Sequence, residues 1–495
     1  EERNATAGRK AFITTRIGDT AFGIAIVWMF HLSGSVSITH LNSMGQIIPA
    51  GIVTALGILL LIGAAGKSAQ LPLSVWLPDA MAGPTPVSAQ IHAATMVTAG
   101  VYLLARMFPL IGGSEVVCAA IALTGGVTAF YAATCACCQR DLKRILAYST
   151  ISQIGYMVLG VGAGALTGAT FHLLTHAFFK ALLFLGAGCV ITALHHQQDI
   201  FAMGGLKQRL GAVYWPFLAG SLCLAGFPFT GGFFSKDAIL GAVLERGGTL
   251  YGGLFGLGLL TALLTAFYTF RMVFVVFHGT ENNPPLPQGE GRGEGGVTQP
   301  HPHPDPPLEG EGMLPPIMTW TLIPLALLGL FGGILNLPAY LGVHGLLDGF
   351  LGATTGFSVP EPATHAREVI LQIVAGGVSL VGLGLAWRRY AGSRRALALA
   401  REEAGSPLAA FLLNGWYLDT LYRLLLIRPF AWLARILWKG VDEAGIDGTL
   451  DGLARFTARL GQLPAAWSSG RVVTSLFGLA GGVCAVLAYV AWLVG

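Results

Sequence analysis

Several ionisable residues lie inside or beside long apolar runs of the sequence, and seven of them are candidates for chemistry. They are Lys67, His92, His172, His176, Lys180, Lys236 and Asp237. A charged residue at the centre of a bilayer costs about 2.5–3.5 kcal/mol on insertion scales, so such residues are functional candidates by default. Histidine exchanges a proton near neutral pH, and a lysine taken out of water can release its proton as well. The set therefore predicts a relay that passes protons between buried side chains through intervening water.

Three of these residues share one face of a predicted helix. The run FHLLTHAFFKALLFL places His172, His176 and Lys180 at i, i+4 and i+8, within about 80° of one face and over about 12 Å. Two histidines at this spacing can bind zinc, but there is no HExxH glutamate, and a lysine shares their face. We therefore predict proton transfer and no metal site. The alternative, in which each histidine only hydrogen-bonds a core carbonyl, leaves the lysines and the aspartate unexplained.

The other candidates lie near predicted helix breaks. Lys67 ends an apolar run shortly before Pro72 and Pro78, and the pair Lys236 and Asp237 follows the glycine-rich stretch 226–232. Non-helical backbone at membrane depth persists only where it faces protein or a wet cavity, and ion transporters use such breaks at their binding sites. A kink without a role is the alternative. Two further sets are polar for their depth: Arg16 with Asp19 at i, i+3, and Tyr148, Ser149, Thr150, Ser152 and Gln153.

The sequence contains no pattern for a redox cofactor. There is no GxGxxG after a strand, no P-loop and no cysteine set for an iron-sulfur cluster. The seven cysteines lie in or beside apolar runs, which favours buried free thiols over disulfides or a zinc site. We therefore expect no cofactor on this chain and an energy source elsewhere.

The composition identifies the class of protein that must position these residues. Only 11% of the 495 residues are charged, where a globular chain carries about 25%. Apolar residues make up 54%, and the 69 glycines suit helices that pack closely in lipid. The net charge of +4 is small, which argues against a nucleic-acid partner. These features predict an all-α, polytopic transmembrane helix bundle with the lipid bilayer as its main partner.

A bilayer core needs about 20 apolar residues per helix, and about eleven stretches meet this requirement. They lie near 17–32, 47–76, 87–108, 114–138, 145–165, 167–194, 210–245, 250–278, 316–343, 369–388 and 472–494. The stretches 47–76 and 210–245 are too long for simple rods, so we expect these two to be broken.

The basic residues predict the orientation of the chain. If the spans alternate, fifteen Lys and Arg residues fall on one side: Arg3, Arg9, Lys10, Arg16, Arg140, Lys143, Arg144, Lys207, Arg209, Arg292, Arg388, Arg389, Arg394, Arg395 and Arg401. Three fall on the other: Arg106, Arg246 and Arg367. The positive-inside rule then places the N-terminus in the cytoplasm and the C-terminus in the periplasm of a bacterial inner membrane.

Two segments are not expected to span the membrane. The insert 279–315 is rich in Pro, Gly and Glu and cannot bury a core, so we predict cytoplasmic disorder. The stretch 408–462 mixes aromatic and basic residues, which predicts a long amphipathic lateral helix on the cytoplasmic face, interrupted at Pro429 and at its glycines. The predicted organisation is a transmembrane core (1–278), the insert (279–315), two further spans (316–390), the lateral helix (391–470) and a C-terminal anchor (471–495).

Three blocks of the sequence resemble a known family. They are AAGKSAQLPLSVWLPDAMAGPTPVSAQIHAATMVTAGVYLLAR (64–106), DLKRILAYSTISQIGYM (141–157) and FHLLTHAFFKALLFLGAG (171–188). All three resemble the antiporter-like subunits of proton-pumping NADH:quinone oxidoreductase, respiratory complex I. The segment 408–462 with one last span resembles the lateral helix of chain 5, also called chain L. The likeness covers nearly all of the chain except the insert.

The resemblance implies a role for each candidate. Lys67 is similar to the lysine of the family's Lys/Glu pair, and His92, His172, His176 and Lys180 are similar to connecting relay groups. Lys236 with Asp237 resembles the terminal pair near the exit. Quinone reduction in partner subunits, which also hold NADH, FMN and the iron-sulfur clusters, would drive this relay, and the lateral helix 408–462 would contact other membrane-arm subunits.

The chain also departs from the family pattern. Compared with that family, we expect this chain to lack about the first five spans, and therefore the glutamate partner of Lys67 to be missing and Lys67 to lack a compensating charge. Two other functions remain open. One is a subunit of an Mrp-type sodium/proton antiporter or a bicarbonate-uptake relative, and the other is an inert structural clamp.

Overall fold

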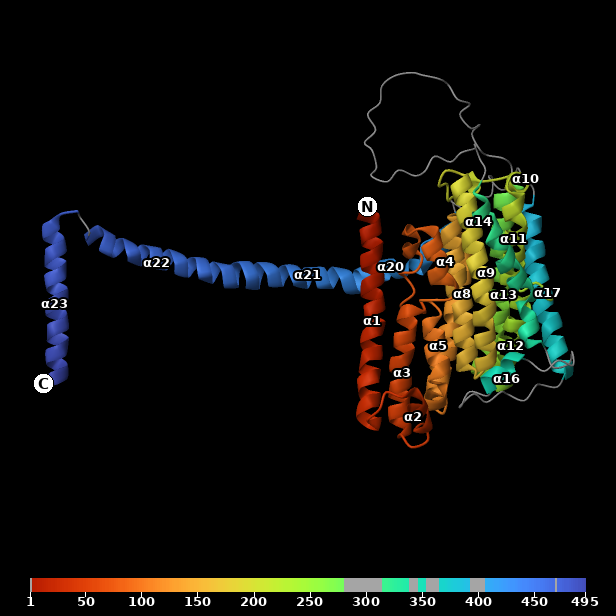
Figure 1. Cartoon of the computed structure of the whole chain (residues 1–495), viewed down its shortest axis with the longest axis horizontal. Coiled ribbons are helices and arrows are strands. Elements are labelled where there is room, and N and C mark those ends of the chain that lie inside the picture. Colours follow the sequence, from red (N-terminus) through yellow and green to blue (C-terminus); the bar gives the residue numbers. More distant parts are fainter. Residues whose placement is uncertain (1, 280–313, 338–345, 353–364, 392–405, 468–469) are drawn as a thin grey trace, which may run out of the picture. The chain divides into compact units, whose positions relative to one another are not determined.

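The computed structural model describes residues 2–279, 314–337, 346–352, 365–391, 406–467 and 470–495 (Figure 1). Its α-helices are α1 (Glu2–Ser33), α2 (Ile38–Ser43), α3 (Ala50–Lys67), α4 (Thr85–Ala93), α5 (Ala99–Arg106), α6 (Phe108–Ile111), α7 (Glu115–Cys138), α8 (Leu142–Gly162), α9 (Leu166–Ala193), α10 (Leu206–Arg209), α11 (Gly211–Ala225), α12 (Gly231–Arg246), α13 (Gly248–His278), α14 (Pro316–Trp320), α15 (Leu322–Phe331), α16 (Leu346–Gly352), α17 (His365–Tyr390), α19 (Pro407–Leu413), α20 (Leu418–Tyr422), α21 (Arg428–Ile436), α22 (Gly448–Trp467) and α23 (Val472–Val494). The short 3-10 and π-helical elements are η1 (Asp79–Ala82), η2 (Ile200–Ala202), η3 (Gly332–Asn336), η5 (Gly415–Tyr417), η6 (Arg423–Ile427) and η7 (Leu437–Asp447). Nearly all of the predicted insert, residues 280–313, lies outside the described residues.

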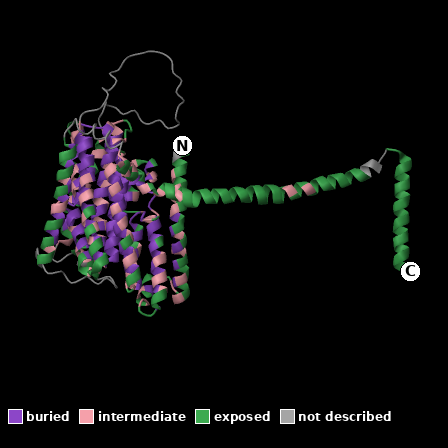
Figure 2. Ribbon diagram, turned by 180° about the vertical axis from the view of Figure 1, so that it is seen from behind, coloured by how far each residue is buried: buried purple, intermediate pink, exposed green. Residues whose placement is uncertain are grey.

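The chain forms two compact units, Glu1–Tyr417 and Leu418–Gly495. The first has a buried interior, whereas the helices of the second are exposed almost throughout (Figure 2). In the second unit, α20 to α22 continue into one another through the π-helical elements η6 and η7. The predicted interruptions at Pro429 and at the glycines are therefore wrong, because π-helical turns keep this segment helical.

The fold is that of an all-helical, multi-pass membrane protein. Eight described helical segments are long and apolar enough to cross a membrane: Ala50–Lys67, Glu115–Cys138, Leu142–Gly162, Leu166–Ala193, Gly248–His278, Pro316–Asn336, Ala366–Tyr390 and Val472–Val494. The other three predicted spans correspond to α1, which carries several charges, and to the divided pairs α4–α5 and α11–α12. The composition argument for the fold class is confirmed.

Both predicted helix breaks are present. α3 ends at Lys67, and the following residues up to Pro84 contain only η1. α11 ends at Ala225, and Gly226 takes the left-handed conformation with a φ of 71°, which glycine adopts at little cost. α12 begins at Gly231. Lys67 is thus the last residue of one helix, and Lys236 lies in the second turn of another.

A third break divides the predicted span 87–108, between α4 and α5. There the Thr95 hydroxyl donates to the Gln90 carbonyl at 2.8 Å, so a side chain competes for a helical acceptor. Residues 94–98 contain no proline or glycine, so no breaker marked this position. The described part of the chain therefore contains one break in addition to the two that were predicted.

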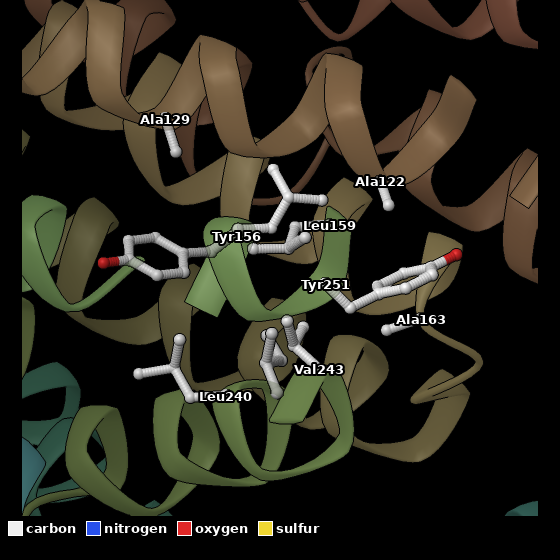
Figure 3. Close-up of a cluster of buried hydrophobic side chains, with 10 residues drawn as sticks. Ala122, Ala129, Tyr156, Leu159, Ala163, Leu240, Val243 and Tyr251 are labelled. Atoms are coloured by element: carbon white, nitrogen blue, oxygen red, sulfur yellow. The ribbon is translucent and has the colours of Figure 1, made fainter. Parts of the chain in front are cut away.

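α8 lies at the centre of the packing. A Cβ added to Gly125 of α7 would lie 2.3 Å from Leu159 N, and one added to Gly155 would lie 2.7 Å from Ala129 N. Small residues permit this close approach of helices, which lipid itself does not drive. Next to this contact, Tyr156 and Leu159 pack among residues of α7, α12 and α13 (Figure 3). The polar residues of α8 are consequently held inside protein.

Candidate functional site

The predicted stripe on α9 faces the protein interior. His172, His176 and Lys180 all have exposed fractions of 0%. The ring centroids of the two histidines are 6.3 Å apart. Because each residue is fully buried, each must find its polar partners on neighbouring helices.

His172 connects three helices. Its Nδ1 lies 2.8 Å from the Ser235 hydroxyl on α12, and its Nε2 lies 3.1 Å from Gln153 Oε1 on α8. The Ser235 hydroxyl also lies 3.1 Å from that of Thr175. Gln153 belongs to the polar set seen on α8 in the sequence, whereas Ser235 was not predicted. A side-chain network therefore surrounds His172, which the core-carbonyl alternative does not describe.

Lys180 contacts one turn of α8. Its Nζ donates to the Leu146 carbonyl at 3.2 Å and to the Ser149 hydroxyl. The Ser149 hydroxyl in turn donates to the Leu146 carbonyl at 2.8 Å. The ammonium group is therefore held by neutral oxygens, with no carboxylate among its hydrogen-bond partners in the described chain.

His176 and His92 meet at the unexpected break in α4–α5. His176 Nδ1 lies 3.1 Å from the carbonyl of Ala93, the last residue of α4. Carbonyls in the last turn of a helix lack intrahelical partners, so the break supplies this acceptor. The alternative that each histidine only hydrogen-bonds a core carbonyl therefore accounts for Nδ1 of His176 but not for its Nε2. The ring of His92 packs on Phe184 at 4.7 Å, and neither of its nitrogens has a hydrogen-bond partner among the described residues.

Lys236 lies at the break between α11 and α12. Its Nζ donates to the Leu224 carbonyl in the last turn of α11 at 2.6 Å and lies 5.8 Å from the centre of the Tyr156 ring. Its exposed fraction is 4%, and that of the neighbouring Asp237 is 5%. The helix break therefore provides free carbonyl oxygens at the position of a buried lysine.

Lys67 has a carboxylate partner in this chain. Its Nζ lies 3.1 Å from Asp19 of α1, and Arg16 is 3.7 Å from the same carboxylate. The expectation that Lys67 lacks a compensating charge is therefore wrong. The sequence paired Asp19 only with Arg16, because their i, i+3 spacing is visible along the chain and the approach of α1 to α3 is not. No hydrogen bond joins Lys67 to His92 in the described part of the chain.

Sequence reasoning also missed a buried arginine. Arg271 on α13 has an exposed fraction of 0%, and its guanidinium donates to the Gln139 carbonyl at 2.8 Å. It lies 5.3 Å from the ring centre of Phe201 and 5.7 Å from that of Tyr390. A charge inside the apolar run 250–278 was the available signal. The described residues contain no group of three or more His, Cys, Asp or Glu side chains that could hold a metal ion.

Comparisons with known proteins identify the class to which this arrangement belongs. The family model described as NADH:quinone oxidoreductase/Mrp antiporter, transmembrane, matches residues 1–265. The chain belongs to this family of antiporter-like membrane subunits.

The relatives point to a particular subunit. NADH-quinone oxidoreductase subunit L of Pseudomonas aeruginosa is 40% identical over 494 residues, covering 98% of this chain and 72% of the relative. Subunit L of Escherichia coli K12 is 41% identical, covering 88% of this chain and 65% of the relative. The structure of the Mrp complex from Dietzia sp. matches 100% of this chain and 47% of that chain with a TM-score of 0.62 and 21% identity, which supports the fold alone. The resemblance to the chain 5 or chain L type is confirmed.

Proposed function

We propose that this chain is a proton-translocating membrane-arm subunit of NADH:quinone oxidoreductase, with the relay formed by the seven predicted residues. The observation that carries the proposal is a set of buried polar side chains on four helices, some of which are joined by hydrogen bonds: His92 on α4, Ser149 and Gln153 on α8, the three-residue stripe on α9, and Lys236 on α12. Keeping so many polar groups in a membrane interior is expensive, and proton transfer accounts for all of them together.

The contacts suggest how a proton would move. His172 would relay a proton by binding one proton at Nδ1, which contacts the Ser235 hydroxyl, and releasing another from Nε2. Gln153 Oε1 accepts a hydrogen bond from Nε2 and would hold the ring in place. Buried polar atoms without protein partners are normally hydrogen-bonded to ordered water. His92 and the Nε2 of His176 are such atoms, so we propose that water joins α4 to the stripe on α9. Lys236 with Asp237 would then release the proton.

Lys67 with Asp19 would couple the relay to its energy source. We propose that this chain has no redox chemistry and that NADH, FMN, the iron-sulfur clusters and quinone bind to partner subunits. A change of charge near the Lys67–Asp19 pair would alter the electrostatic attraction between the two side chains. The pair would thus transmit an electrostatic signal from the partners to this chain.

The proposed location is a bacterial inner membrane, with the N-terminus and the segment 408–462 on the cytoplasmic side and the C-terminus in the periplasm. The excess of basic residues in alternate loops supports this orientation. In the second unit, Phe430 and Trp432 have exposed fractions of 72% and 61%, which suits an amphipathic segment that covers other membrane-arm subunits. The five-part division of the chain remains part of the same proposal.

Replacing Lys236 with Ala tests the function in the assembled complex. We expect a lower ratio of protons translocated per electron in membrane vesicles, and the exposed Lys207→Ala provides the control. An unchanged ratio would overturn the relay and leave the inert clamp. Translocation that depends on sodium and continues without any NADH dehydrogenase partner would instead favour the Mrp-type alternative.

A further inference from the structure

The segment 407–417, which contains α19 and η5, is docked on α7 within the first unit. Three hydrogen bonds join them: Gln139 Nε2 to the Leu413 carbonyl at 3.2 Å, Trp416 Nε1 to the Thr134 hydroxyl at 3.2 Å, and the Tyr131 hydroxyl to the Gly415 carbonyl at 3.4 Å. The ring of Trp416 also meets that of Tyr131 edge to face, at 5.3 Å and 86°. Both the backbone carbonyls and the Trp416 side chain of this segment therefore contact α7 and the residue that follows it.

The backbone of η5 has an uncommon conformation. Gly415, Trp416 and Tyr417 have φ angles of 58°, 54° and 53°. Glycine tolerates this region, but large side chains adopt it only where their surroundings hold them there. The stacked ring of Phe411, 5.8 Å from that of Trp416, is one such support. The contacts with α7 thus fix a conformation that the segment would not favour alone.

Gly415 also reaches α8. A Cβ added to Gly415 would lie 3.1 Å from the hydroxyl oxygens of both Tyr131 and Tyr148. The two tyrosine rings meet edge to face, at 6.4 Å and 71°. Tyr148 precedes Ser149, whose hydroxyl accepts the hydrogen bond from Lys180. The docked segment therefore touches the turn of α8 that holds a lysine of the proposed relay.

We propose that the segment 407–417 positions Lys180, acting through Gly415, Tyr131 and Tyr148 on the α8 turn 146–149. This inference rests on the proposed function. The segment is a positioning element, because it acts on Lys180 only through α8. If the turn shifts, the two oxygens that accept from Lys180 move with it, and the protonation equilibrium of the lysine changes.

Titratable groups from several helices lie near Lys180. The experiment therefore needs a reference variant that changes the contact between Lys180 and α8. His92 on α4, His176 on α9 and Lys236 on α12 are electrostatically coupled to Lys180, and Tyr268 on α13 lies beside Ser149. Ser149→Ala removes one acceptor of Lys180 and keeps all four of these side chains, although it also removes the hydroxyl beside Tyr268. It therefore defines the effect that loss of the Ser149 hydroxyl has on the pH profile.

The experiment compares Gly415→Ala with Gly34→Ala in the assembled oxidoreductase. Both glycines have a positive φ, 58° and 67°, but the added methyl group meets two phenol oxygens at Gly415 and has open space at Gly34. We expect Ser149→Ala and Gly415→Ala to shift the pH midpoint of NADH-driven proton translocation in the same direction, by about one pH unit. Gly34→Ala should not shift it, and the double variant Ser149→Ala/Gly415→Ala should shift no further than Ser149→Ala alone.

Tyr148→Phe removes the hydroxyl and keeps the ring packing, so it decides the question if Gly415→Ala does not assemble. A shift in the same direction as Ser149→Ala supports the proposal. Wild-type pH profiles for Tyr148→Phe and Gly415→Ala, beside a shifted Ser149→Ala, overturn it and leave the proposed function intact. If Lys180→Ala and Ser149→Ala both translocate protons normally, the proposed function fails and this inference fails with it.

Discussion

His172 Nδ1 lies 2.8 Å from the hydroxyl of Ser235, a contact that joins the second turn of α9 to the start of α12. The Ser235 hydroxyl also lies 2.8 Å from the carbonyl of Gly231, the first residue of α12. Because α12 begins again after a helix break, this serine and the lysine that follows it reach the centre of the bundle together. The contact links the histidines of the proposed relay to Lys236.

Ser235→Ala should impair proton transfer without unfolding the subunit. Loss of a hydrogen bond of this kind costs about 0.5–1.5 kcal/mol, which corresponds to a decrease of about two- to tenfold in rate. The measurement is the initial rate of NADH-driven proton translocation in vesicles, with the exposed Ser43→Ala as control. A wild-type rate for Ser235→Ala would show that protons do not pass through this contact.

Asp19→Asn should lower turnover by removing the charge that compensates Lys67. The amide keeps the size of the side chain but leaves the ammonium group 3.1 Å away without its counter-charge. Steady-state NADH oxidation coupled to quinone reduction measures the effect, and Asp19→Glu should restore part of the activity. The exposed Glu245→Gln of α12 is the matched control, and equal activities for it and Asp19→Asn would contradict the role of the pair.

Gly125→Ala should destabilise the bundle, because the new methyl group would lie 2.3 Å from the backbone of α8. Overpacking of this kind costs about 1–3 kcal/mol. Thermal unfolding of the detergent-solubilised complex should show a lower Tm than for Gly256→Ala, where the methyl group has open space. Equal Tm values would mean that α7 and α8 separate easily.

Arg271→Lys should also lower the Tm, although the charge is kept. An ammonium group cannot stack on two rings as the planar guanidinium does, and a desolvated cation-π contact is worth about 2 kcal/mol. The exposed Arg209→Lys is the control in the same thermal assay. If Arg271→Lys unfolds at the wild-type temperature, charge alone accounts for the arginine.

Features that depend on a few neighbouring residues were predictable. The i, i+4, i+8 spacing of His172, His176 and Lys180 placed them on one face, because helix geometry repeats whatever surrounds it. The break at Gly226 was predictable because the glycine-rich stretch 226–232 is itself a local feature of the sequence. The break after Ala93 was not, because it depends on a threonine hydroxyl competing for a backbone carbonyl rather than on proline or glycine. The Asp19–Lys67 pair was missed because 48 positions separate its members.

The amino-acid sequence by itself determined that this chain lies in a membrane and that it carries lysines and histidines at depth, since hydropathy and residue type are properties of the chain alone. Only the tertiary structure decided which oxygen each of them contacts. Leu146, Leu224 and Ala93 contribute backbone carbonyls, and every residue type has one, so no sequence pattern could select them. These carbonyls became partners because helix breaks exposed two of them and because α9 packs against α8 at the third.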